Sequence, residues 1–190
     1  MWIAGIEVTT SVSENGLDPS SRTFAFLGRI IRMTALARAT DAQIDAVCDA
    51  FATVSWPLDR GDFTAVAERL GWQLKVETSS GVQHRSGYPV NLPTVRSLIA
   101  EQAVSQVTVA VSDKSDDRAG LRSVALDVQS ALSRHLGQPS GAHAGDPFWE
   151  LDNGGRIWLK TVPKKVLLVV EGQRFADVER REERLGLGAD

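Results

Sequence analysis

The pattern of apolar and polar positions predicts two helices in the first half of the chain. Over residues 40–54, apolar residues recur at i, i+3, i+4 and i+7, and Thr40 and Gln43 form the T-x-x-Q pattern of a capping box. Residues 59–70 form a shorter apolar stripe, and Gly71 follows at the position that a helix-ending glycine takes. Both segments are expected to bury one side.

Two further helices are predicted in the second half. A long apolar stripe follows the acidic segment 113–117 and runs to Leu136, where Gly137 and Pro139 stop it. Residues 173–185 are highly charged, with both signs represented, which is typical of a solvated helix surface. The few apolar side chains of this last helix are Phe175, Val178 and Leu185.

Strands are predicted from alternating or continuous apolar runs. Residues 72–78 alternate, and residues 104–111 are rich in β-forming side chains. Residues 94–103 are ambiguous between helix and strand. The segment before them, 79–93, is expected to be a loop with a short strand near Val90.

Residues 148–170 predict three consecutive strands at the centre of a sheet. Asn153-Gly154-Gly155 is a turn signal between two apolar runs. The last run, 166–170, has no polar alternation, which is typical of a strand that is buried on both faces. A three-residue loop would pair Leu151 with Ile157, whereas a two-residue loop would pair Leu151 with Arg156. Burial of the apolar set favours the three-residue loop.

The three-residue loop assigns the side chains of this hairpin to two different faces. Trp149, Leu151, Ile157 and Leu159 share the apolar face. The other face combines charges with two aromatic rings: Phe148, Glu150, Asp152, Arg156, Trp158 and Lys160. One interpretation is a solvated sheet face that another element partly covers. The alternative is a partner-binding surface with Trp158 and Phe148 as anchors.

The order of these elements predicts an α+β fold, because strands cluster after helices instead of alternating with them. We expect a mainly antiparallel sheet of about five strands, packed by the N-terminal helices, a long central helix and a C-terminal helix. Residues 33–190 are expected to form this single domain. Residues 1–32 fit the pattern poorly and are expected to be a poorly ordered or loosely packed extension.

The composition narrows the classes of function. The 190 residues carry a net charge of −3, so no basic excess indicates nucleic-acid binding. No apolar run approaches the ~20 residues that a membrane span needs, and the N-terminus lacks the pattern of a secretory signal. The single cysteine, Cys48, lies in a predicted apolar stripe and is interpreted as a buried side chain. A cytoplasmic location is expected.

The chemistry-bearing residues form no recognisable site. The three histidines, His84, His135 and His143, lack the spacing of metal ligands. Segment 113–117 superficially resembles a calcium loop, but Arg118 stands where glycine is needed. No phosphate-binding loop or nucleophile motif occurs. The sequence therefore predicts no catalytic residue, no metal and no cofactor, and favours a non-enzymatic role, although catalytic groups can be scattered along a chain.

Short segments resemble an uncharacterised actinobacterial family of small α+β proteins, a domain of unknown function. They are residues 67–72 (AERLGW), preceded by 56–58 (WPL), and residues 136–139 (LGQP), followed by a hairpin and a buried strand. The similarity covers residues 33–185. The order of elements is also similar to that of secretion-chaperone-like folds.

These resemblances imply an immunity-type or secretion-accessory, chaperone-like protein. Its partner would be another protein, such as a cognate toxin or a secreted substrate, and not a nucleic acid or a membrane. The alternative is a small-ligand-binding protein or enzyme that uses the loop 79–88 with His84, Arg85 and Tyr88. A third hypothesis is a homodimer that pairs through an edge strand such as residues 104–111.

Overall fold

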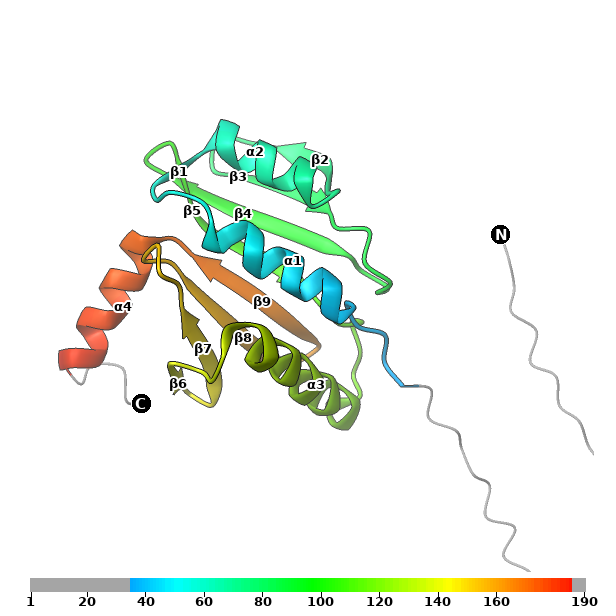
Figure 1. Cartoon of the computed structure of the whole chain (residues 1–190). Helices are drawn as coiled ribbons and strands as arrows, with labels where there is room; N and C mark the ends of the chain where they lie inside the picture. Colours follow the sequence, from blue (N-terminus) through cyan, green and yellow to red (C-terminus); the bar gives the residue numbers. More distant parts are fainter. Residues whose placement is uncertain (1–34, 186–190) are drawn as a thin grey trace, which may run out of the picture. The chain divides into compact units, whose positions relative to one another are not determined.

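The computed structural model describes residues 35–185, which contain four helices and nine strands (Figure 1). In chain order they are α1 (Asp41–Ala52), β1 (Leu58–Asp59), α2 (Arg60–Arg69), β2 (Gln73–Glu77), β3 (Gly81–Arg85), β4 (Thr94–Ala100), β5 (Ala103–Ala110), α3 (Arg118–Leu136), β6 (Gly141–His143), β7 (Asp146–Glu150), β8 (Arg156–Val162), β9 (Lys165–Glu171) and α4 (Gln173–Leu185). The extension predicted over residues 1–32 lies outside the described residues.

The strands of the described region form one antiparallel sheet. Its order is β2-β3-β4-β5-β9-β8-β7-β6, and the two-residue strand β1 pairs with the start of β5. The mainly antiparallel α+β fold is therefore confirmed. The prediction of about five strands is wrong, because the sheet has nine.

Three of the additional strands, β1, β3 and β6, come from segments with few β-forming residues. β3 lies inside the segment predicted to be a loop, and it pairs with β2 on one side and β4 on the other. β4 resolves the ambiguous segment 94–103 as a strand, whereas the predicted strand near Val90 is a bend. Cross-strand neighbours, rather than local preference, stabilise β3.

The sheet consists of two four-stranded meanders that join at its centre through β5 and β9 (Figure 1). Val107 pairs with Val170 and Val109 with Leu168 along this junction. β9 has buried side chains on both faces, as predicted. β5 pairs on both sides, so the hypothesis of a homodimer through residues 104–111 is wrong about the strand: in the described sheet the edges are β2 and β6.

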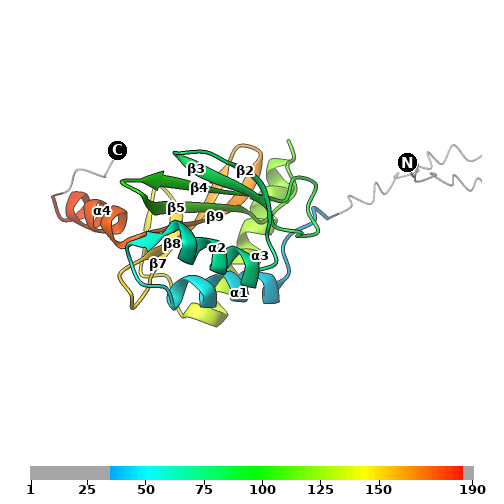
Figure 2. The ribbon, with the colours of Figure 1, turned by 90° about the horizontal axis from the view of Figure 1, so that it is seen from above.

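Helices α1, α2 and α3 lie on one face of the sheet (Figures 1 and 2). The capping box at the start of α1 is confirmed, with the Thr40 side chain accepting from the Gln43 backbone. Gly71 ends α2 with a positive φ of 69°, as a C-terminal glycine does. Between these helices and the sheet lies the main core, which includes Ile44, Phe51, Phe63, Leu132, Trp149, Ile157, Leu159 and Leu168.

The β7–β8 hairpin has the predicted faces but not the predicted register. Trp149 pairs with Ile157, and a three-residue loop, 152–154, closes the hairpin one position earlier than expected. The pairing therefore differs from the predicted one by two residues. A shift of two keeps every side chain on its face, so the apolar set still enters the main core.

A contact to α1 accounts for the position of this loop. The Asn153 side-chain amide donates to the backbone carbonyls of Phe51 and Val54, both at 2.8 Å. The Phe51 carbonyl belongs to the last turn of α1, where backbone acceptors lack helical partners, and Val54 lies just past the C-cap. Asn153 thus fastens the loop to the helix end, and Gly154 adopts the required positive φ of 85°.

Candidate functional site

The opposite face of the sheet carries a fully buried arginine. Arg156, on β8, has no exposed surface and lies beneath α4. Its guanidinium bonds Glu150 on β7 at 2.6 Å, and Glu179 and Glu183 on α4 at 3.0 and 2.8 Å. A planar guanidinium can serve several carboxylates at once, which suits Arg to this position. Arg156 thus contacts two side chains of α4 and one of β7.

Two aromatic rings complete the surroundings of Arg156. The guanidinium carbon lies 3.9 Å from the centre of the Phe148 ring and 5.3 Å from that of Trp158. Both rings are buried, and they form a second, smaller apolar cluster with Val169. Lys160 lies over the outer part of Trp158, at 4.6 Å. Attraction between cations and ring faces adds to the ion pairs here.

A second buried charge, Glu171, adjoins this arrangement. It is only 2% exposed, and it accepts hydrogen bonds from the Trp158 indole at 2.8 Å and from Gln106 at 3.1 Å. Burial, followed by the hydrogen bond to Glu171, raises the pKa of Glu179 to about 7. The contact between α4 and the sheet is therefore mainly polar.

The structure brings together five of the six side chains predicted for partner binding. Phe148, Glu150, Arg156, Trp158 and Lys160 lie side by side on β7 and β8, and α4 covers much of them. The sixth, Asp152, is exposed in the loop 152–154, apart from this group. The predicted face is thus the surface on which α4 packs. Its role in partner binding stays a prediction.

Helix α4 turns its charged side toward the sheet and its apolar side outward. Its one buried residue is Ala176, next to the charged contacts of Glu179, Arg180 and Glu183. Phe175, Val178 and Leu185 are 42%, 53% and 63% exposed. A surface helix usually buries its apolar stripe, so this orientation is the reverse of the common one.

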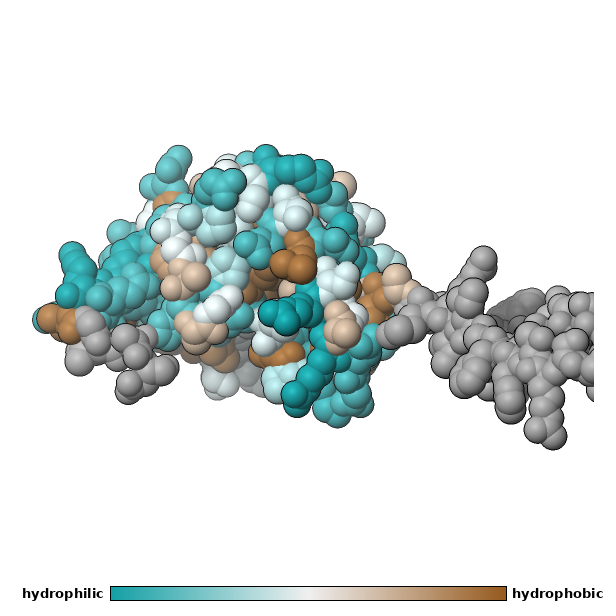
Figure 3. All heavy atoms as spheres, turned by 90° about the horizontal axis from the view of Figure 1, so that it is seen from below, coloured by the Kyte–Doolittle hydropathy of each residue, from teal (hydrophilic) through white to brown (hydrophobic). Residues whose placement is uncertain are grey.

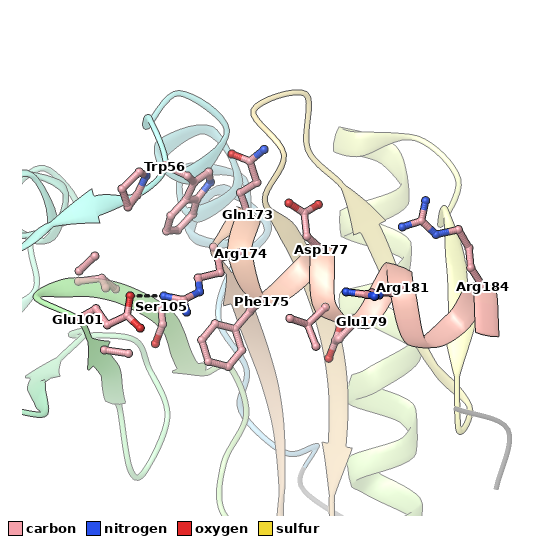
Figure 4. A pocket seen from close by; sticks show the side chains of 16 residues that line it. Trp56, Glu101, Ser105, Gln173, Arg174, Phe175, Asp177, Glu179, Arg181 and Arg184 are labelled. Carbon is pink, nitrogen blue, oxygen red and sulfur yellow. Dashed lines mark hydrogen bonds and ion pairs between the residues drawn. The ribbon is translucent and has the colours of Figure 1, made fainter. Parts of the chain in front are cut away.

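The exposed apolar side of α4 forms one wall of a groove of about 1060 Å³, which we call the α4 groove (Figure 4). The opposite wall is the end of the β4–β5 hairpin, and Trp56 and Pro57 lie at one end. Figure 4 shows Phe175 directed toward the hairpin. The residues that line the groove include Trp56, Glu101, Arg174, Phe175, Val178, Arg181 and Arg184.

Two glycines allow Trp56 to reach its place in the α4 groove. A Cβ atom on Gly155 would come within 2.7 Å of the Trp56 indole nitrogen. A Cβ on Gly172 would come within 2.8 Å of the same ring. Real Cβ atoms do not approach so closely, so the indole packs here only because both positions lack a side chain.

The charges along the α4 groove are unevenly balanced. Arg174 forms an ion pair with Glu101 across the groove (Figure 4). Arg180, on the neighbouring side of α4, bonds Glu150 and Asp177. Within residues 35–185, Arg181 and Arg184 form no ion pair. Among the charged side chains that line the groove, these two arginines are therefore the ones without an ion pair in the described residues, and Glu182 between them offsets part of their charge.

Two of the three side chains named for the alternative site at residues 79–88 are buried. His84 is buried between Phe63 and Trp72, with ring centres 5.6 and 6.3 Å away, and burial lowers its pKa. Burial likewise raises the pKa of Tyr88 to about 12. Neither residue lines the α4 groove or the smaller hollow near α3. These side chains belong to the core, and only Arg85 is exposed.

Cys48 is buried, as the sequence predicts, and burial raises the pKa of its thiol to about 12.

Across residues 35–185, no group of three or more His, Cys, Asp or Glu side chains is arranged to hold a metal ion. In the same range, no helix combines the length and the apolar character needed to cross a membrane. The surface seen in Figure 3 is mainly hydrophilic, with small, separate hydrophobic patches.

Residues 42–172 match a family of unknown function, DUF6301. The chain belongs to the DUF6301 family. The match confirms the predicted resemblance to an uncharacterised domain, while actinobacterial origin and an immunity role stay predictions. It spans α1 to β9 and ends immediately before α4. Searches of curated proteins and of solved structures found no match.

Sequence reasoning missed the α4 groove, although one signal was present. Phe175, Val178 and Leu185 are spaced by three and seven residues on an otherwise charged helix. This spacing puts them on one side, but it does not say whether that side packs inward. The contacts of Arg156 with Glu179 and Glu183 decide the orientation, and they join residues 23 and 27 positions apart.

Proposed function

We propose that this DUF6301 protein is a non-enzymatic protein-binding module and that the α4 groove receives its partner. The observation that supports this proposal is the outward orientation of Phe175 and Val178 along a groove of about 1060 Å³. Covering such side chains releases about 25 cal/mol for each Å² of apolar surface removed from water. A protein partner can supply that cover.

In this proposal, the predicted face on β7 and β8 does not contact the partner directly but positions α4. Arg156, Phe148 and Trp158 hold α4 in the position that keeps its apolar side outward. We therefore expect Trp158→Ala to weaken a complex, through displacement of α4 rather than through loss of a direct contact.

The finer proposal is an immunity-type or secretion-accessory protein in the cytoplasm of an actinobacterium. It rests on the resemblance to such families and to secretion-chaperone-like folds. The partner would be a cognate toxin or a secreted substrate. Co-purification with the product of the adjacent gene, after cell fractionation, tests both the partner and the location.

The proposed site can be tested by site-specific photo-crosslinking in the cells that produce the protein. A photoreactive residue replaces Val178 in the α4 groove or, as a matched control, Val76 on β2. The two valines are equally exposed, at 53%. We expect a covalent complex with one protein from position 178 and none from position 76. No complex from either position, or equal labelling from both, would contradict the proposal.

A further inference from the structure

We infer that the α4 groove binds an amphipathic helix that carries carboxylates beside its apolar stripe. This inference rests on the proposed protein-binding function and specifies the part of the partner that binds. Three observations carry it: the spacing of the exposed apolar side chains, the backbone pairing around the groove, and the positive charge that the groove leaves uncompensated.

The spacing of the apolar side chains suits a helix. Phe175, Val178 and Leu185 occupy positions of a heptad pattern, in which Glu182 takes the fourth place. Side chains at this spacing lie in one row along α4, and a second helix can pack its own row against them. The ten helical steps from Phe175 to Leu185 extend over about 15 Å, since a helix rises ~1.5 Å per residue. A partner helix of three to four turns would cover them.

The backbone around the groove argues against an added strand. Strand addition needs an unpaired edge of a sheet. At the hairpin wall, β5 already pairs with β4 on one side and with β1 and β9 on the other. The Gly172 backbone also donates to the carbonyl of Ser105. Neighbouring strands therefore occupy the backbone groups at this wall, and side chains must make the contacts to a partner.

The uncompensated charge determines the chemistry of the partner. Arg181 and Arg184 are one turn apart on α4, close to Val178 and Leu185, and they line the end of the groove away from Trp56 (Figure 4). The protein as a whole has a net charge of −3. Charges in water act mainly within the screening length of ~8 Å at physiological salt, so the two arginines, partly offset by the neighbouring Glu182, determine the local charge. Carboxylates flanking the apolar stripe of the partner would complete ion pairs with them.

The test measures fluorescence anisotropy of three labelled peptides with the full chain. The 15-residue helical peptides share one leucine stripe and differ only in the flanking residues, which are Glu, Gln or Lys. We expect the Glu peptide to bind about fivefold more tightly than the Gln peptide, as two partly exposed ion pairs allow, and the Lys peptide to bind most weakly. The double variant R181E/R184E should reverse this order.

A matched control makes the same change of net charge elsewhere. In residues 35–185, Arg118 and Arg122 on α3 likewise form no ion pair, so R118E/R122E should leave the order of the three peptides unchanged. Equal affinities for all peptides, no binding of any of them, or an order that R181E/R184E does not alter would overturn the inference. A photo-crosslinked partner at position 178 would still support the proposed function in those cases.

A second copy of this chain is a different possible occupant of the groove. The mass of the purified protein in solution distinguishes it from a partner helix. If α4 packed against α4 of another copy, the purified protein would have the mass of a dimer, and Val178→Asp would convert it to a monomer. That result would overturn the inference of a partner helix with flanking carboxylates. A monomeric mass together with the expected peptide order supports it.

Discussion

The guanidinium of Arg156 lies 3.9 Å from the centre of the Phe148 ring, and neither side chain reaches solvent to a substantial extent. An arginine buried against an aromatic face keeps its charge, so it needs carboxylates, and α4 supplies two of them. This relationship explains why a highly charged helix packs on the sheet. It also makes Arg156 a central side chain in the attachment of α4, beside the ion pair of Arg180 with Glu150.

Replacing Arg156 by alanine should destabilise the protein by about 3 kcal/mol. The change removes the cation from the carboxylates of Glu179 and Glu183 and leaves Glu150 with Arg180 alone, which is the costly way to break a buried ion pair. We take the lower end of the usual range because these carboxylates are 31–38% exposed. Urea denaturation at pH 7 measures the loss. Arg85→Ala, at an exposed arginine of β3, is the control and should change stability by less than about 0.5 kcal/mol.

The attachment of α4 should weaken as the pH rises through neutrality. The pKa of Glu179 is raised from 4.5 to about 7, first by burial and then by Glu171, so packing α4 favours the protonated carboxyl. A carboxyl of this kind stabilises the packed state fully below about pH 4.5 and loses that contribution as the pH passes 7. We expect faster amide exchange in α4 at pH 8 than at pH 5.5, after correction for intrinsic rates. Glu179→Gln should remove most of the difference.

A second carboxyl of this contact, that of Glu150, has a pKa shifted in the opposite direction. Although burial opposes it, Arg180 and Arg156 hold the pKa of Glu150 below its ordinary value. Its contribution is present above that ordinary value and is lost only as the pH falls below it. Glu150 therefore does not account for a change between pH 5.5 and 8. Equal exchange of α4 amides at the two pH values would contradict the role of Glu179.

Truncating the outward side chains of α4 should leave stability almost unchanged. Phe175 and Val178 are half exposed, so Phe175→Ala and Val178→Ala should alter the free energy of unfolding by less than about 0.5 kcal/mol each. Ala176→Glu, one residue away, introduces a charge at a fully buried position and should displace α4. Urea denaturation compares the three variants. A large loss in the first two would show that these side chains pack within the protein.

Adding a methyl group at Gly172 should destabilise the protein by about 1–3 kcal/mol, as overpacking usually does. The new Cβ would overlap the Trp56 ring, which would have to leave its place at the end of the α4 groove. Gly61→Ala in α2 is the control, because the nearest atom to its Cβ is a side-chain oxygen of Asp59 at 3.3 Å. Thermal unfolding gives the stability, and the emission maximum of the tryptophans reports the displacement. Equal effects of the two substitutions would contradict a specific role of Gly172.

Local sequence signals predict much of the fold. The capping box of Thr40 and Gln43 marks the start of α1, and alternation separates Trp149 and Ile157 from Phe148 and Trp158. The capping box depends on residues that are close in sequence, and the two faces of a strand follow from the alternation of side chains. Both can be recognised in a single sequence. β3 could not be predicted in this way, because its two partner strands stabilise it.

The candidate site could be predicted only in part. The sequence identifies the face of Arg156 and Trp158 as unusual, but it does not show that α4 covers this face. Helical periodicity predicts that Phe175 and Val178 lie on one side of the helix. Surface helices usually bury their apolar side, so burial of these two residues would be expected. The opposite orientation follows from a long-range requirement, since buried Arg156 needs the carboxylates of Glu179 and Glu183.

The junction of β5 and β9 has a consequence for synthesis on the ribosome. The two strands are paired at the centre of the sheet, yet Gln106 and its partner Glu171 are 65 positions apart. During translation, the β9-facing edge of β5 in the first meander (β2 to β5) therefore stays unpaired until β9 has been synthesised. Pairing between segments so far apart in sequence is slow. Helix α4 follows β9 directly, so the groove is completed last. A chain that terminates before Gln173 lacks α4 and therefore one wall of the groove.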